Sequence, residues 1–230
     1  SRLVTSMFRF RGFDPRAPVR VYHRNLPHWR QEGCPYFVTF RLADSIPRAV
    51  VLRQQEARRV WLDAHGIGPT TSAVEATRKY AAIAVRERRA FERSQAHELH
   101  VELDRCHGSC LFRGAENRAL VHGALLHFHG VRHACGDFAI MPNHVHWLVQ
   151  PLAGFALENI LRAVKQFTSG RVIGAVRGSV WQSDSYDHIV RDSRELNSCR
   201  RYIAENPAKA GVPGSEGIVY RADWLDEALP

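Results

Sequence analysis

The stretch Met141-Pro142-Asn143-His144-Val145-His146-Trp147-Leu148-Val149 combines a turn signal with an apolar segment of β type. The dipeptide Pro142-Asn143 predicts the turn, and the residues after it predict a strand. Because alternate side chains of a strand point the same way, His144 and His146 are expected on one face. Two imidazoles side by side on a strand indicate a metal site, or half of one.

Context separates this pair from chance, since the chain has 13 histidines and a second His-x-His at His127 and His129. The second pair ends the segment 119–129, which has the pattern of a helix. Residues two apart on a helix point about 200° away from each other and cannot share a metal ion. Only the pair at His144 and His146 therefore predicts a metal site.

Length and composition favour one globular unit. The chain has 230 residues, of which 45% are hydrophobic, enough for one sizeable core. No run approaches the roughly 18 apolar residues of a membrane helix, and residues 1–18 lack the apolar core of a signal peptide. Five scattered cysteines, an odd number, fit reduced thiols. We expect a cytoplasmic protein with no membrane segment.

A net charge of +9 predicts an anionic partner, and nucleic acid is the natural candidate. Residues 1–30 carry seven arginines against the single acid Asp14, with aromatic residues between them. Such a segment suits phosphates and stacked bases, although a merely solubilising basic arm is the alternative. The side chains predicted to contact DNA are Arg24, Trp29, Arg30, Lys165, Arg171 and Gln182.

The pattern of strands and helices predicts an α+β fold, an antiparallel sheet covered by helices. Tyr36, Val38, Phe40 and Leu42 are expected to face one way on a first strand. The remaining expected strands span 132–140 and 144–150, and the expected helices span 48–64, 72–98, 115–129, 156–173 and a last one from Asp192 to a stop at Asn206-Pro207. Three segments follow: a basic arm (1–35), one domain (36–214) with a helical insertion at about 48–98, and a C-terminal tail (215–230).

Four motifs together resemble one protein family. In order, MPNHVHWLV, AVKQFTSGRV, VWQSDSYDHIVRD and CRRYIAENPAKAGV resemble the pattern of the REP-associated tyrosine transposases, relatives of the single-tyrosine HUH transposases. The segment YHRNLPHWRQEGCPYFVTFRLADSIP is similar to the opening of longer members. The resemblance covers about residues 22–47 and 100–214.

The resemblance implies a ferredoxin-like core and a metal-dependent cleavage of single-stranded or hairpin DNA. His144 and His146 would bind Mg²⁺ or Mn²⁺, and Tyr202 would be the nucleophile. Many relatives carry a glutamine four residues after the tyrosine, where this chain has Asn206, a candidate third ligand. The product would be a 5′-phosphotyrosine and a free 3′-hydroxyl, which permits strand transfer by a monomer or a homodimer. Arg200 or Arg201 would favour the phenolate.

Three alternatives stay open. Tyr186 is the competing nucleophile because it lies close to His188 in the sequence. A zinc hydrolase would join the histidine pair to a carboxylate or histidine among Asp187, His188 and Asp192. A non-catalytic relative would bind palindromic DNA without cutting it.

Overall fold

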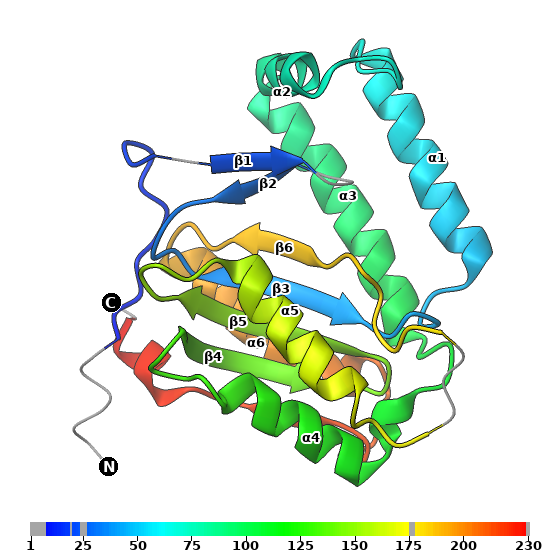
Figure 1. The fold of residues 1–230 in the computed structure, drawn as a ribbon, viewed down its shortest axis with the longest axis vertical. Helices are drawn as coiled ribbons and strands as arrows, with labels where there is room; N and C mark the ends of the chain where they lie inside the picture. Colours follow the sequence, from blue (N-terminus) through cyan, green and yellow to red (C-terminus); the bar gives the residue numbers. More distant parts are fainter. Residues whose placement is uncertain (1–7, 19, 24–26, 175–177, 229–230) are drawn as a thin grey trace.

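The computed structural model describes residues 8–18, 20–23, 27–174 and 178–228. Its centre is a five-stranded antiparallel sheet with the strand order β6-β3-β5-β4-β7 (Figure 1). The strands are β3 (Tyr36–Arg41), β4 (His133–Ile140), β5 (His144–Pro151), β6 (Tyr186–Ile189) and β7 (Ile218–Tyr220). The short turn at 141–143 joins β4 to β5, so the predicted hairpin is confirmed. The protein is therefore α+β, as the sequence predicted.

The chain order of strands and helices makes the sheet ferredoxin-like. The strand β3 connects through helices to β4, and β5 lies between them in the sheet. In the same way β5 connects through α5 (Leu157–Ser169) to β6, with β3 between them. These two interleaved split β-α-β units define the ferredoxin-like arrangement. The strand β7 is added at the edge beside β4.

Helices cover both faces of the sheet (Figure 1). One face packs on α4 (Ala115–Leu126) and α5, and its core contains the side chains predicted to face one way, namely Tyr36, Val38, Phe40 and Leu42. The other face packs on α6 (Ser193–Lys209) through Leu196 and Ile203. Because His144 and His146 alternate with Val145 and Trp147 along β5, the histidines belong to the α6 face.

Three helices are inserted between β3 and α4, and they project from the sheet as two arms joined by α2 (Figure 1). They are α1 (Arg48–Ala64), α2 (Ala73–Ala82) and α3 (Val85–Asp104). The single helix predicted over 72–98 is wrong in two ways. Extended backbone at Ile83 and Ala84 breaks it, with Ile83 buried at the break, and α3 continues to Asp104.

Three further boundaries differ from the sequence prediction. The helix α4 ends at Leu126, and His129 lies in a turn where its Nδ1 accepts a hydrogen bond from the amide of Cys135. The helix α6 continues past Pro207 to Lys209. The helix α5 ends at Ser169. Helical spacing predicts one apolar stripe of Leu157, Ile160, Leu161, Val164 and Phe167, but Phe167 is 45% exposed with the guanidinium of Arg171 over its ring, so it is not part of the buried stripe.

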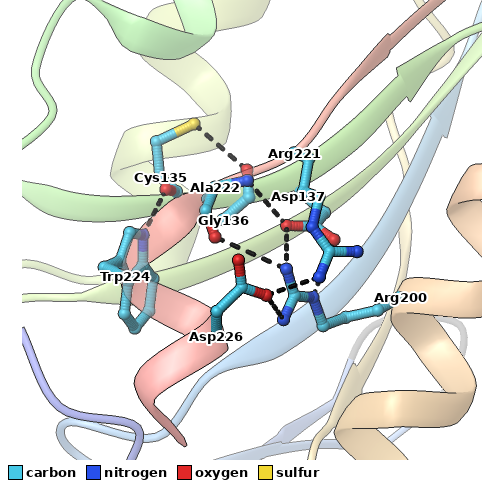
Figure 2. Close-up of polar contacts among 8 residues, drawn as sticks. All are labelled: Cys135, Gly136, Asp137, Arg200, Arg221, Ala222, Trp224 and Asp226. Atoms are coloured by element: carbon cyan, nitrogen blue, oxygen red, sulfur yellow. Dashed lines mark hydrogen bonds and ion pairs between the residues drawn. The ribbon is translucent and has the colours of Figure 1, made fainter.

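Segments outside the ferredoxin-like core also form structure. The strands β1 (Arg20–His23) and β2 (Pro27–Arg30) pair in an antiparallel hairpin within the basic arm. Near the other end of the chain, β7 and the 3-10 helix η3 (Asp223–Ala228) pack on β4, and Trp224 donates a hydrogen bond to the carbonyl of Cys135 (Figure 2). A second 3-10 helix, η2 (Leu111–Arg113), precedes α4. In the described ranges, no helix is long and apolar enough to cross a membrane.

Candidate metal and tyrosine site

The two strand histidines meet at one point on the buried α6 face. Both side chains are fully buried, and their Nε2 atoms lie 3.0 Å apart. The register places His146 opposite Thr39 of β3, and the Oγ1 of Thr39 lies 2.8 Å from the Nδ1 of His146. The ring of Phe37 stacks on His146, with centroids 5.6 Å apart. Strand pairing and packing thus fix the direction of both imidazoles.

The turn residue Asn143 determines which nitrogen of His144 carries the proton. The amide nitrogen of Asn143 donates to the carbonyl of His107, so its Oδ1 faces the Nδ1 of His144 at 2.7 Å. Because a carbonyl oxygen only accepts, His144 is protonated at Nδ1, and its Nε2 presents a lone pair to the site. A partner of this kind on the far nitrogen is typical of metal-binding histidines.

Burial keeps both imidazoles neutral. It lowers the pKa of His144 to about 3, with a smaller contribution from His100. Burial also lowers the pKa of His146 well below its usual value, followed by the effects of His144 and His100. When His146 donates its own Nδ1 proton to Thr39, two lone pairs face each other across 3.0 Å. A cation between them would remove this repulsion.

The helix α6 brings Tyr202 and Asn206 to the same point. The hydroxyl of Tyr202 lies 3.4 Å from the Nε2 of His146, and the amide nitrogen of Asn206 donates to that hydroxyl at 3.2 Å. The four-residue spacing keeps both side chains on one face because α6 stays helical through Pro207. Asn206 is fully buried, and its Oδ1 has no hydrogen-bond partner among the described residues.

An acidic residue that the sequence analysis missed completes this cluster. Asp104, the last residue of α3, accepts a hydrogen bond from Asn206 at 3.1 Å. Asp104, His144 and His146 each offer one ligand atom, and these three atoms lie within 4.8 Å of one another. Burial raises the pKa of Asp104, opposed by the hydrogen bond from Asn206. In the sequence, the feature that could have indicated Asp104 is its four-residue spacing from His100, which puts both side chains on one face of α3.

Burial also keeps the phenol of Tyr202 protonated. It raises the pKa of Tyr202 well above the ordinary value, and the carboxylate of Asp104 raises that pKa further. The expected help from Arg200 is not present, since Arg200 is buried and pairs with Asp137 at 2.9 Å and with Asp226 at 2.8 Å (Figure 2). The prediction that Arg200 favours the phenolate is therefore wrong, because its guanidinium forms the ion pairs that link α6 to β4 and η3.

Replacing Arg200 by alanine is expected to lower the free energy of unfolding by about 3–5 kcal/mol, because Asp137 would be left buried without its cation. Replacing its exposed neighbour, Arg201→Ala, is expected to cost under about 0.5 kcal/mol. Urea unfolding monitored by circular dichroism measures both values. Equal stability of the two variants would contradict a structural role for Arg200.

The residues predicted to touch DNA fall in different places. Arg24 lies outside the described residues, and Trp29 belongs to β2, where its backbone pairs with Val21. Arg30 is buried and binds Asp187 through two nitrogens, at 2.6 and 2.8 Å, and Glu158 at 2.6 Å. These ion pairs link β2 to α5 and β6, so the guanidinium of Arg30 binds carboxylates of the protein itself.

Two of the other three predicted DNA contacts, Lys165 and Gln182, meet at the loop before β6. The ammonium of Lys165 donates to the carbonyls of Gln182 at 2.8 Å and of Ser183 at 3.2 Å. Gln182 itself lines a cavity beside β6, and Arg171 is exposed at the end of α5. The structure does not bring these three side chains together with the histidine pair.

The residues of the alternative readings lie away from the histidine pair. Asp187 binds Arg30, His188 lies 2.6 Å from Glu195, and Asp192 caps α6 by accepting from the amide of Glu195. In the part of the chain that the structure covers, the acid grouped with the pair is Asp104. The zinc site predicted with Asp187, His188 or Asp192 is therefore wrong. Tyr186 lies on β6, and its ring reaches His100, with centroids 5.7 Å apart.

Comparison with known proteins gives two similarities. No family model matches the chain. An uncharacterized protein of Haemophilus influenzae is 28% identical over 95 residues, which cover 31% of this chain and 52% of that protein. The chain thus spans about half the length of this curated relative.

Among solved structures, the chain is similar to a REP-associated tyrosine transposase bound to a REP hairpin. The identity is 14%, the TM-score is 0.43, and the match covers 83% of this chain and 73% of that one.

Proposed function

We propose that this protein is a metal-dependent tyrosine nuclease of the REP-associated transposase type. It cleaves single-stranded or hairpin DNA through a covalent 5′-phosphotyrosine intermediate and transfers the cleaved strand. The observation that carries the proposal is the hydroxyl of Tyr202, 3.4 Å from the Nε2 of His146. A nucleophile and a metal-binding pair within reach of one phosphate are what this reaction needs.

The donor set fits a divalent cation. Two neutral imidazoles and the carboxylate of Asp104 supply three ligand atoms, and the Oδ1 of Asn206, without a partner in the described chain, is a candidate fourth. Mn²⁺ and Mg²⁺ accept carboxylate and amide oxygens, and Mn²⁺ also accepts imidazole nitrogen. When bound, the ion would orient the scissile phosphate and neutralise its developing charge.

The side chains of the site have separate roles in the reaction. Tyr202 loses its phenolic proton and attacks phosphorus; the new O–P bond forms as the bond to the 3′ oxygen breaks, and that oxygen takes up a proton. Asn206 orients the phenol through its hydrogen bond. Asn143 and Thr39 hold the two imidazoles in place. Because the phosphotyrosine link conserves the bond energy, a second 3′-hydroxyl can displace Tyr202 and rejoin the strand.

The test is incubation with labelled hairpin DNA that carries a single-stranded tail, in the presence of Mn²⁺. A labelled species that migrates with the protein on a denaturing gel supports the proposal, and chelation of the metal should remove it. DNA binding with no covalent species under any metal would contradict cleavage and favour the non-catalytic reading.

Replacing Asp104 by asparagine is expected to weaken Mn²⁺ binding by about 100-fold, because the only carboxylate of the described cluster is lost. Isothermal titration calorimetry measures the affinity. The matched control is Glu98→Gln on the same helix, whose carboxylate pairs with Arg53 instead. The variant Asn206→Ala tests whether Asn206 rather than Asp104 is the third metal ligand. If Asn206→Ala weakens Mn²⁺ binding and Asp104→Asn does not, Asn206 is the ligand and Asp104 is not.

A further inference from the structure

A groove of about 760 Å³ lies between the inserted helices and the edge of the sheet. Its walls come from α1 and α3 on one side, and from β3, β6 and the loop before β6 on the other. The ferredoxin-like core alone would not form it, because α1 and α3 supply one wall. The insertion therefore adds a surface whose role the reaction at Tyr202 does not explain.

Arginines dominate the charge of this groove. Six line it against four carboxylates: Arg41, Arg58, Arg59, Arg88, Arg89 and Arg191 against Asp63, Glu92, Asp184 and Asp187. Several of these groups form ion pairs, since Asp63 binds Arg59, Asp187 binds Arg30 and Arg191 lies 3.6 Å from Glu195. By formal charge the lining still has two more arginines than carboxylates, which favours an anionic ligand.

Two side chains on α1 offer hydrogen-bond donors to the groove. Arg58 is half-buried in its wall, where burial lowers the pKa of the guanidinium and the charge of Asp184 opposes that effect. One turn earlier, the Nε2 of Gln54 is buried and has no hydrogen-bond acceptor among the described residues. A buried donor without an acceptor costs about 1–3 kcal/mol, which a bound ligand would recover. Both donors point to a ligand rich in acceptors.

The rest of the lining suits flat apolar groups and leads toward the catalytic residues. Leu62, Leu99 and the ring of Tyr186 belong to it, as does Thr39. Thr39 and Tyr186 both contact His100, whose ring also lies 5.2 Å from that of His146. The groove therefore reaches the histidine pair through Thr39, whose Oγ1 lies 2.8 Å from the Nδ1 of His146, and through the ring of His100.

We propose that this groove binds the single-stranded segment of the DNA next to the cleavage position. The inference rests on the proposed function and gives the helical insertion a role within it. A single strand presents phosphates to the arginines and unpaired base faces to the apolar lining. A duplex stem also presents phosphates to the arginines, but its base faces are stacked inside the helix and cannot contact the apolar lining.

The experiment measures binding without chemistry. Fluorescence anisotropy in EDTA compares a labelled single strand of about 12 nucleotides with a blunt hairpin stem. The variant Arg58→Gln/Arg89→Gln is expected to bind the single strand at least about 10-fold more weakly and to show a shallower salt dependence, by about 0.7 per lost phosphate contact. Binding of the blunt stem is expected to stay within about 2-fold of the wild type.

The matched control is Arg86→Gln/Arg93→Gln. It removes the same charge from exposed positions of α3 that do not line the groove. If both double variants lose affinity equally, the effect is general electrostatics and the groove assignment is wrong. Absence of any single-strand binding by the wild type would also overturn it.

A second variant separates ligand binding from folding. Gln54→Leu removes a buried donor that has no partner in the described chain, so its melting temperature is expected to equal or exceed that of the wild type. Its affinity for the single strand is expected to fall about 3- to 10-fold. An unchanged affinity would contradict a role for this donor in the groove.

The outcomes also separate this inference from the proposed function. If the wild type forms the adduct and Arg58→Gln/Arg89→Gln binds the single strand normally, the groove is not the binding site, but the proposed nuclease activity stands. If binding depends on the groove arginines and no adduct forms, the groove is the binding site, but the proposed nuclease activity is wrong.

Discussion

Replacing Tyr202 by phenylalanine is expected to abolish the covalent protein–DNA adduct, a loss of at least about 1,000-fold in cleavage. The change removes one oxygen atom, the one that lies 3.4 Å from His146. The ring contacts with Phe37 and His146 stay, so the fold and DNA binding should persist. A denaturing gel measures the adduct, and anisotropy measures DNA binding.

The control is Tyr186→Phe, since Tyr186 is the competing nucleophile. Tyr186 lines the groove beside β6, and its ring contacts His100, with centroids 5.7 Å apart. We expect this variant to form the adduct at a rate within about 10-fold of the wild type. An adduct that survives Tyr202→Phe and disappears in Tyr186→Phe would move the nucleophile to β6.

Replacing His146 by alanine is expected to weaken Mn²⁺ binding by at least about 100-fold and to remove cleavage with it. One of the two facing nitrogens is lost, and the remaining ligands sit on separate elements, β5 and α3. The variant should still bind DNA, because the arginines that line the groove do not depend on the metal. Calorimetry with Mn²⁺ and anisotropy with DNA measure the two properties separately.

The chain offers a matched control in its second His-x-His pair. His127 is exposed just beyond α4, and His129 accepts a backbone hydrogen bond. Replacing His127 by alanine is expected to leave Mn²⁺ affinity and cleavage unchanged. Mn²⁺ binding and cleavage at wild-type levels in His146→Ala would place the metal elsewhere and contradict this account of the site.

Local patterns predicted the central sheet well. Alternation in β3 and β5 assigned the side chains to faces correctly, because one face of each strand is buried against helices and the register follows from it. The turn before His144 was also clear from its sequence. The four-residue spacing of Tyr202 and Asn206 predicted their common face, which α6 keeps by remaining helical through Pro207.

Long-range packing decided what the sequence could not predict. Asp104 belongs to the cluster because the fold brings the last residue of α3 beside the histidine pair, and no spacing near His144 and His146 encodes that contact. The ion-pair partners of two arginines were also not visible in the sequence. Arg30 was expected to contact DNA and Arg200 to contact the phenol of Tyr202. Both are buried in ion pairs, with Asp187 and Asp137 respectively, and each partner is more than 60 residues away in sequence.

The break between α2 and α3 has a similar cause. Residues 72–98 are rich in helix-forming residues and contain neither glycine nor proline, so local propensity favours one helix. Ile83 and Tyr80 are instead buried at the break, and the hydroxyl of Tyr80 on α2 donates a hydrogen bond to Glu92 on α3 at 2.8 Å. The result is the two-armed insertion that forms the groove wall.

Catalysis by Tyr202 is tested by identifying the residue that carries DNA after the reaction. Wild-type protein is incubated with hairpin DNA and Mn²⁺, digested with nuclease and protease, and analysed by tandem mass spectrometry. We expect a 5′-linked nucleotide on Tyr202, present with Mn²⁺ and absent with EDTA. A nucleotide on Tyr186, or bound DNA and bound Mn²⁺ with every tyrosine unmodified, would show that Tyr202 is not the nucleophile.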